Sequence, residues 1–206
     1  MLIVGAKGHA VEVLQCLSTT EREQTVFFDN VTPDQLDKLF GIYPVLRTPA
    51  QAQAYLAGTD PRFALGLGGP GLRRRLATQL QAWGGQLISV IAPTAIVGPF
   101  TTLGEGLNIM QHTLVSPTSI IGEGVLLNAG AAVHHDSIVG DYCEISPGVR
   151  ILGHCRLGQN CWVGASAVIL PGVVVGQDAI IGAGAIVTRS VEAGTTVVGI
   201  PARLIS

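Results

Sequence analysis

Aliphatic residues recur at every sixth position through the second half of the chain. From Ile91 to Val187, all 17 positions of this series hold Ile, Leu or Val, with no slip in phase. The residue four positions after each of them is small or β-branched in every unit but one, which has Leu107. A six-residue repeat of this kind predicts a parallel β-helix, in which each unit is a short strand followed by a bend.

The length of the repeat predicts the dimensions of this β-helix. Three units close one triangular coil, so 17 units predict about 5.7 coils stacked roughly 4.8 Å apart. We expect the aliphatic residue to fill the coil interior and the small residue to fit at a corner. Glycine directly follows the aliphatic residue in 8 of the 17 units, where it would accept backbone angles that a Cβ strains. Cys143, Cys155 and Cys161 occupy the small position, which indicates packing rather than a catalytic or metal-binding role.

The first 90 residues have a different pattern, in which short apolar runs alternate with helical periodicity. Strands are expected at 1–4, 25–28 and 62–67, and helices from the glycine turn after Val4 to about Leu17, from Pro49, and at 72–83. Alternating strands and helices predict a small parallel α/β sheet of Rossmann-like type. The expected domains are therefore residues 1–88 and 89–206.

The first strand leads into a turn that is typical of nucleotide-binding units. Gly5, Gly8 and His9 follow the strand, and Asp29 ends the second strand about 20 positions later. Main-chain N–H groups at a helix start can meet a phosphate or a base, and the carboxylate can accept from a ribose or base. Ala10 replaces the third glycine of the dinucleotide fingerprint, so an ordinary strand-to-helix turn is the alternative. The sheet is also too small for a complete dinucleotide fold, which argues against a dehydrogenase.

Charge and composition exclude several classes of protein. The chain has 12 Lys+Arg against 14 Asp+Glu, and its longest basic run is Arg73–Arg75, which gives little support for nucleic-acid binding. No apolar stretch reaches the roughly 18 residues of a membrane span, and no signal peptide is expected at the N-terminus. The four cysteines lack a CxxC spacing, so we expect reduced thiols in a cytoplasmic protein.

One histidine of the β-helix is a candidate general base. His135 is expected at a corner, pointing away from the interior, and Asp136 follows it. A carboxylate beside an imidazole fixes the tautomer and stabilises the imidazolium, although a solvated pair on a polar edge is the alternative. Gly153 lies 18 residues later, so one coil places it next to His135. A zinc site is disfavoured, because the histidine spacing lacks the short His-x4-His interval of zinc-type carbonic anhydrases in this architecture.

Segments from both halves of the chain form one ordered series of motifs. In the second half these are residues 128–136, 139–141, 146–148, 153, 181–187 and 198–203, and in the first half residues 4–9, 28–30 and 67–73. The series resembles the sugar acyltransferases of the left-handed β-helix superfamily over nearly the whole chain. It is most similar to bacterial nucleotide-sugar N-acetyltransferases acting on 4-amino-4,6-dideoxyhexoses, and sialic acid O-acetyltransferases share the pattern.

The resemblance implies a left-handed β-helix, a homotrimer with three active sites between neighbouring prisms, and a role in surface polysaccharide, lipopolysaccharide or O-antigen synthesis. It implies acetyl-CoA as co-substrate without a metal, and direct attack by the sugar amine with His135 as base and Asp136 orienting it. The implied acetyl-CoA-binding residues are Gly153, whose N–H meets the thioester carbonyl, Ala165, Gly182 and Pro201. The implied nucleotide-sugar-binding residues are Gly5, Gly8, His9, Asp29, Asn30, Gly68 and Arg73. The partners would be the nucleotide-linked sugar, acetyl-CoA and further copies of the chain, with no nucleic acid and no membrane.

Some positions and alternatives stay open. Glu144 stands nine residues after the base, where some relatives have a second histidine. Arg73 belongs to an arginine triplet, so a solvated helix face is its alternative. The resemblance places Trp162 and residues 201–203 where the far end of CoA would bind, and surface packing is the alternative for each. A sugar O-acetyltransferase and a non-catalytic β-helix scaffold trimer are the alternative functions, and the matching first half counts against the scaffold. The base of the nucleotide (UDP, dTDP or GDP) is not determined by the sequence.

Overall fold

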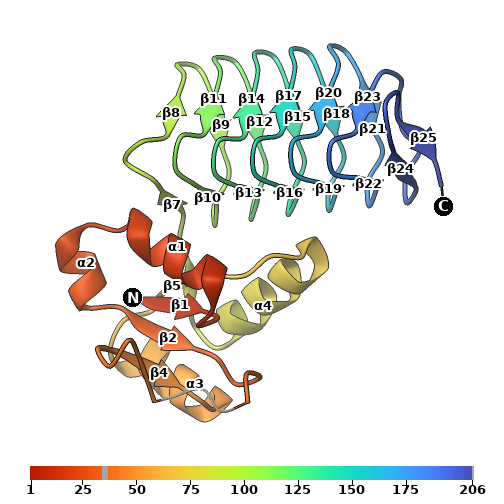
Figure 1. Cartoon of the computed structure of the whole chain (residues 1–206). Helices are drawn as coiled ribbons and strands as arrows, with labels where there is room; N and C mark the ends of the chain where they lie inside the picture. Colours follow the sequence, from red (N-terminus) through yellow and green to blue (C-terminus); the bar gives the residue numbers. More distant parts are fainter. Residues whose placement is uncertain (34–36, 206) are drawn as a thin grey trace.

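The computed structural model describes residues 1–33 and 37–205, in which an α/β domain is followed by a three-sided prism (Figure 1). The first domain has four helices within these residues: α1 (Gly8–Cys16), α2 (Thr19–Glu23), α3 (Pro49–Gly58) and α4 (Pro70–Ala82). Its described strands are β1 (Leu2–Val4), β2 (Val26–Phe28), β3 (Lys38–Leu39), β4 (Tyr43–Leu46), β5 (Arg62–Leu65) and β6 (Gln86–Leu87). All the helices of the described part of the chain are too short or too polar to cross a membrane.

The sheet of this domain has the strand order β3-β4-β2-β1-β5-β6. Its neighbours pair in parallel, apart from β3, which is antiparallel to β4. The predicted small parallel α/β sheet is therefore confirmed. Two of the helices, α2 and α3, begin at capping boxes formed by Ser18 and Thr48, and Pro49 takes the first position of α3.

The prism is built from two-residue strands that follow the six-residue repeat. One face consists of β7 (Val90–Ile91), β10 (Asn108–Ile109), β13 (Leu126–Leu127), β16 (Glu144–Ile145), β19 (Trp162–Val163) and β22 (Ile180–Ile181). The second consists of β8 (Ile96–Val97), β11 (Leu114–Val115), β14 (Ala132–Val133), β17 (Arg150–Ile151), β20 (Val168–Ile169) and β23 (Ile186–Val187). The third consists of β9 (Thr102–Leu103), β12 (Ile120–Ile121), β15 (Ile138–Val139), β18 (Arg156–Leu157) and β21 (Val174–Val175).

Each strand pairs in parallel with the strand one coil later, as Val133 does with Ile151. The expected 18-residue coil is thereby confirmed. After β23, the strands β24 (Thr196–Val198) and β25 (Arg203–Leu204) form an antiparallel pair that continues the first face at the C-terminal end.

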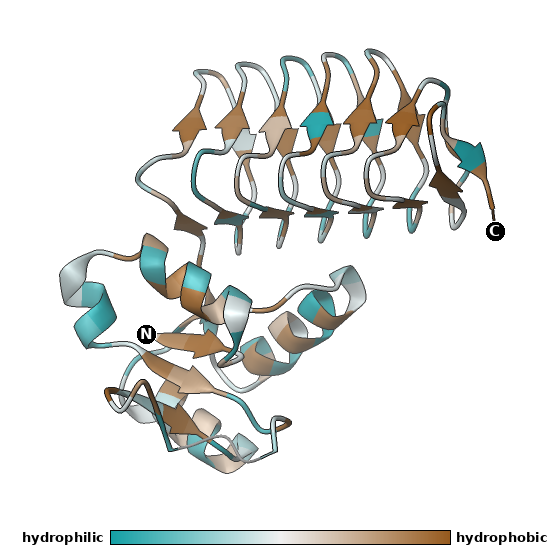
Figure 2. Ribbon diagram, in the orientation of Figure 1, coloured by the Kyte–Doolittle hydropathy of each residue, from teal (hydrophilic) through white to brown (hydrophobic). Residues whose placement is uncertain are grey.

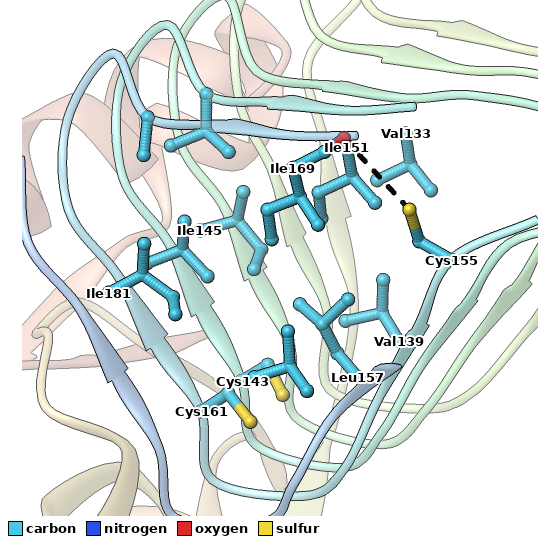
Figure 3. Close-up of a cluster of buried hydrophobic side chains, with 14 of the residues drawn as sticks. Val133, Val139, Cys143, Ile145, Ile151, Cys155, Leu157, Cys161, Ile169 and Ile181 are labelled. Atoms are coloured by element: carbon cyan, nitrogen blue, oxygen red, sulfur yellow. Dashed lines mark hydrogen bonds between the residues drawn. The ribbon is translucent and has the colours of Figure 1, made fainter. Parts of the chain in front are cut away.

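The aliphatic residues fill the prism interior from Ile109 onward (Figure 3). The hydropathy colouring shows most strands of the prism in brown, with β17, which contains Arg150, in teal (Figure 2). Ile91 and Val97 are 42% and 38% exposed, because no coil precedes them to cover that end. Cys143, Cys155 and Cys161 are fully buried, which confirms their interpretation as packing residues.

The glycines that follow the aliphatic residues are required for a reason other than the expected one. None of these eight has a positive φ. A Cβ on Gly104 would lie 2.7 Å from the nitrogen of Glu123 in the next coil, and Gly140 has the same relation to Gln159. The close stacking of coils, rather than backbone strain, therefore excludes a side chain here. The left-handed conformation falls two positions later, in an unbroken series of 15 units from Phe100 to Gly184.

The α/β domain packs on the face that contains β10, β13 and β16 (Figure 1). Arg73 on α4 donates to Asn108 Oδ1 and to the Gly124 carbonyl of the prism. The main-chain N–H of Gly69 donates to Glu144 Oε2 at 2.6 Å. These contacts fix which side of the prism the first domain covers.

Candidate active site

His135 and Asp136 form a hydrogen-bonded pair at the bend between β14 and β15. The distance from His135 Nδ1 to Asp136 Oδ2 is 2.7 Å, and the Thr118 hydroxyl donates to Asp136 Oδ1 at 2.8 Å. The hydrogen bonds from His135 and Thr118 hold the pKa of the Asp136 carboxyl below its usual value. Because a carboxylate only accepts hydrogen bonds, Nδ1 carries the ring proton and Nε2 is the free acceptor. Nε2 is therefore the atom that can take a proton.

Gly153 lies against the ring of His135. A Cβ at Gly153 would be 2.7 Å from His135 Cε1 and 2.8 Å from Nε2, so the position has no room for a side chain. The expected stacking of the two residues one coil apart is confirmed. Among the described residues, the main-chain N–H of Gly153 has no hydrogen-bond acceptor. This N–H is available to a ligand beside the imidazole.

His154 is a third polar side chain at this edge, to which the sequence assigned no role. It follows Asp136 by one coil, and its Nε2 is 3.7 Å from Asp136 Oδ2. Its ring meets that of His135 edge-on, with 5.1 Å between the centroids. One ligand atom from each of the three residues can be chosen so that all lie within 4.8 Å of one another.

A second candidate site is a cavity of about 510 Å³ in the α/β domain, at the carboxyl ends of β1, β2 and β5. This is the edge of a parallel sheet at which ligands usually bind. Four of the seven predicted nucleotide-sugar residues line it: Gly5, His9, Asn30 and Asp29. Gly5 has a φ of 96°, and a Cβ there would lie 2.9 Å from the Gly66 carbonyl oxygen, so the turn requires glycine.

Asp29 shapes the loop that borders this cavity. Its Oδ1 accepts from the N–H groups of Val31 and Thr32, and its Oδ2 from the Thr32 hydroxyl. Burial alone would raise the pKa of Asp29, but the hydrogen bonds from Thr32 and Val31 outweigh it, so the pKa is lowered. Asn30 beside it is exposed, and its side chain makes no hydrogen bond to the other described residues.

His9 lines this cavity with a side chain that is largely buried. Its Nδ1 lies 3.0 Å from Glu12 Oε2, and its buried Nε2 has no hydrogen-bond partner in the described part of the chain. Burial lowers the pKa of His9, against the opposing effect of the hydrogen bond to Glu12. The ring is therefore neutral near pH 7. With the proton on Nδ1, the enclosed Nε2 is an acceptor without a partner among the described residues.

The prediction that Arg73 contacts a phosphate is wrong. Its side chain is fully buried, and its guanidinium donates to Leu67 O at 2.8 Å and Asn108 Oδ1 at 2.7 Å, besides Gly124 O. The solvated alternative is wrong for the same reason. Successive residues of a helix point about 100° apart, so the triplet is divided: Arg74 lies over the Tyr142 ring, and Arg75 lines the cavity. Helical geometry indicates that the three arginines point in different directions, but it does not indicate which of them faces the cavity.

Two predicted glycines do not line the cavity. Gly68 instead packs on Glu144, since a Cβ there would lie 3.0 Å from Glu144 Oε2. Together with the hydrogen bond from Gly69, this makes Glu144 an anchor for the turn before α4. Gly8 is the first residue of α1. Lys7, which the glycine-turn motif does not single out, lines the cavity.

The predicted acetyl-CoA residues lie at more than one place. Ala165 and Gly182 line a shallow groove of about 330 Å³ together with Ser146 and Trp162. This groove borders the β19–β22 face, whereas Gly153 lies beside His135. Pro201 is in the segment between β24 and β25.

One chain does not bring these groups together. His135 is at the edge between the faces that contain β14 and β15, whereas the α/β domain covers the face that contains β13 and β16. In a three-sided prism, that edge is the one opposite the covered face. The nucleotide cavity and the candidate base are therefore on opposite sides of the same prism.

Both halves of the chain match known protein families. Residues 1–80 match the PglD N-terminal domain, and residues 118–153 and 154–189 match the bacterial transferase hexapeptide family (six repeats). None of the curated proteins matches the chain.

Solved structures match it over almost its entire length. A variant of perosamine N-acetyltransferase from Caulobacter crescentus, in complex with CoA and GDP-perosamine, is 28% identical with a TM-score of 0.89, covering 100% of this chain and 96% of the other. The acetyltransferase domain of PglB from Neisseria gonorrhoeae, in complex with acetyl coenzyme A, is 28% identical with a TM-score of 0.87, covering 99% and 98%. WeeI from Acinetobacter baumannii is 28% identical with a TM-score of 0.86, covering 99% and 98%. The expected left-handed β-helix is thereby confirmed.

Proposed function

We propose that this chain acetylates the 4-amino group of a nucleotide-linked 4-amino-4,6-dideoxyhexose. The reason is that it belongs to the CoA-dependent nucleotide-sugar acetyltransferases with a PglD N-terminal domain and hexapeptide repeats. Acetyl-CoA is the donor, and no metal takes part. The product serves the synthesis of a surface polysaccharide such as O-antigen.

The observation that carries the proposal is the grouping of His135, Asp136 and Gly153. Asp136 holds the His135 ring with Nδ1 protonated, so Nε2 accepts the proton of the attacking sugar amine. Gly153 N–H, beside the same ring, donates to the oxyanion that develops on the thioester carbonyl. Such a donor is worth about 2.7–4 kcal/mol in other enzymes. His135 then returns the proton to the departing CoA thiolate, and no acyl-enzyme forms.

The cavity of the α/β domain suits the nucleotide diphosphate. Lys7 and Arg75 are exposed cations on its wall and can bind the two phosphates. Gly5, His9 and Asn30 supply main-chain and side-chain hydrogen-bonding groups for the nucleotide sugar. Asp29 holds the loop that borders the cavity. Gly8 is close to these groups at the start of α1.

The separation of cavity and base within one chain supports a homotrimer with its active sites between copies. The nucleotide sugar would be held by the α/β domain of one copy, residues 1–88, and meet His135 from the prism of a neighbour, residues 89–206. Ala165, Gly182 and Pro201 would then bind the remainder of acetyl-CoA from the facing prism. Four free buried cysteines fit a cytoplasmic location, where acetyl-CoA and nucleotide sugars are made.

The direct test is release of CoA from acetyl-CoA with a panel of UDP-, dTDP- and GDP-linked sugars. We expect turnover with 4-amino sugars, and a loss of roughly 10²–10⁴-fold in kcat for His135→Ala. Turnover only with hydroxyl acceptors would reject N-acetylation in favour of a sugar O-acetyltransferase. A His135→Ala variant that keeps its full rate would reject the assigned base, and no turnover with any sugar would favour a scaffold.

A further inference from the structure

The mechanism leaves His154 unused, although it shares a carboxylate oxygen with the proposed base. Asp136 Oδ2 has two imidazole nitrogens near it, His135 Nδ1 at 2.7 Å and His154 Nε2 at 3.7 Å. Thr118 engages the other oxygen, Oδ1. The shared oxygen therefore faces two nitrogen ligands, and the three side chains are exposed to incoming ions.

This set of atoms matches the ligands of a divalent transition metal. Zn²⁺ prefers imidazole nitrogen and carboxylate oxygen at about 2.0–2.2 Å, so two ligands on one tetrahedral ion lie about 3.3 Å apart. The observed distances of 2.7 and 3.7 Å fall on either side of this value. In the described part of the chain, no Lys or Arg nitrogen lies within 4 Å of the Asp136 carboxylate, so its charge is available to a cation.

The backbone holds these ligands in place. Asp136 and His154 both have the left-handed conformation, with φ of 60° and 61°, at equivalent positions of successive coils. The N–H of His154 also donates to the carbonyl of His135 at 3.0 Å. The three residues thus project from one rigid edge, and small rotations of exposed side chains are enough to close around an ion.

We propose that a divalent transition-metal ion, with Zn²⁺ as the reference case, binds His135 Nδ1, Asp136 Oδ2 and His154 Nε2 and inhibits the enzyme. A metal on Nδ1 leaves the single proton of the neutral ring on Nε2. Nε2 then donates instead of accepting, and it cannot take the proton of an amine. The inhibition rests on the proposed function of His135, whereas the binding does not.

The matched variants are His154→Ala and His112→Ala. His112 is also an exposed, left-handed histidine of the repeat, but it lies on a different edge of the prism. Zn²⁺ binding to the EDTA-treated protein is measured by calorimetry. Turnover is followed through loss of the thioester, because the thiol of product CoA itself binds zinc.

We expect one Zn²⁺ per chain in the wild type, and a fall in turnover of roughly 10²-fold or more at saturation, towards the His135→Ala level. His154→Ala should keep the wild-type rate in EDTA and require at least about tenfold more zinc for inhibition. His112→Ala should behave as the wild type.

Equal zinc affinity of wild type and His154→Ala, or no zinc binding at all, would overturn the site. Zinc that binds through His154 and leaves turnover unchanged would overturn the inhibition, with the proposed function intact. Zinc bound in this way to a protein that acetylates no nucleotide sugar would instead reject the proposed function and leave the metal site standing.

Discussion

Single residues of the repeat carry both its geometry and its chemistry. The left-handed position recurs every six residues, and most of its occupants are Gly, Asn, Asp, His or a hydroxyl residue. Asp136 takes this conformation and so turns its carboxylate back onto His135. The sixfold pattern predicted a corner at His135. It did not reveal the left-handed position, because glycine holds that place in only some units.

Gly153→Ala tests the contact between the proposed oxyanion donor and the proposed base, His135. The added Cβ would lie 2.7 Å from the His135 ring, and the ring is exposed enough to rotate away rather than unfold the coil. We expect kcat to fall by roughly 10²-fold, the effect of misplacing a reactive group by about 1 Å, with the melting temperature nearly unchanged.

Gly58→Ala in α3 is the control, because a Cβ there has no neighbour within 4 Å. It should leave kcat unchanged. An equal loss in both variants, or an active Gly153→Ala enzyme, would contradict the stacked geometry.

The state of His9 predicts a pH effect on nucleotide-sugar binding. Burial lowers its pKa below the ordinary value of about 6.5, so Nε2 stays an acceptor until the pH falls past that lowered value. Protonation then converts the acceptor to a donor. We expect the KM for the nucleotide sugar to be constant near neutral pH and to rise only below about pH 6.5.

His9→Asn keeps a neutral acceptor that does not titrate. Its KM, measured over the same pH range, should lack the acid rise. The same rise in wild type and variant would assign the effect to another group.

At the scale of elements, three consecutive arginines of α4 make three different contacts. Arg73 ties the domains together, Arg74 packs on Tyr142, and Arg75 faces the cavity. A run of like charges gives no indication of which member is buried. The partners that decide it, Asn108 and Gly124, are far away in the sequence and are brought near only by the fold.

Arg73→Ala should therefore affect mainly the stability of the protein, and Arg75→Ala mainly its binding of the nucleotide sugar. Removing Arg73 leaves buried acceptors without a donor and opens a cavity, which should destabilise the protein by about 3 kcal/mol. Removing Arg75 should raise the KM for the nucleotide sugar roughly tenfold and change stability by less than about 0.5 kcal/mol.

Thermal unfolding and KM, measured on both variants, check this pair of expectations. An Arg75→Ala enzyme with an unchanged KM would remove that residue from the phosphate site. A fully stable Arg73→Ala protein would contradict its role between the domains.

The elements that the sequence predicted are those with a strong repeat or period. The 17 units of the prism and the helices α1, α3 and α4 follow from local pattern alone. The prediction missed α2, a helix of only five residues. It also missed β4, which contains Pro44 and is flanked on both sides by turn-forming residues. The strand β4 depends on its parallel pairing with β2, which no local pattern records, whereas α2 buries no residue and begins at the capping box of Ser18 and Glu21, a local signal that identifies it.

At the scale of the whole molecule, the prism lies between the cavity of the α/β domain and the His135–Asp136 pair. The contacts of Arg73 and Glu144 place the α/β domain on one face, and His135 lies on the opposite edge. The domain order was evident from the sequence, but this placement was not, because it depends on side chains 35 to 75 residues apart. The proposed site between copies rests on this placement.

Mixed trimers test this central claim most directly. One parent carries His135→Ala with an intact cavity, and the other carries Lys7→Glu and Arg75→Glu with an intact base. Each parent alone should be nearly inactive, and CoA release is measured after co-expression of the two in equal amounts. A shared site predicts one restored site in every mixed ring, which is about a quarter of all the sites when the two chains mix at random. Activity no higher than that of the separate parents would contradict it and place the complete site within one chain.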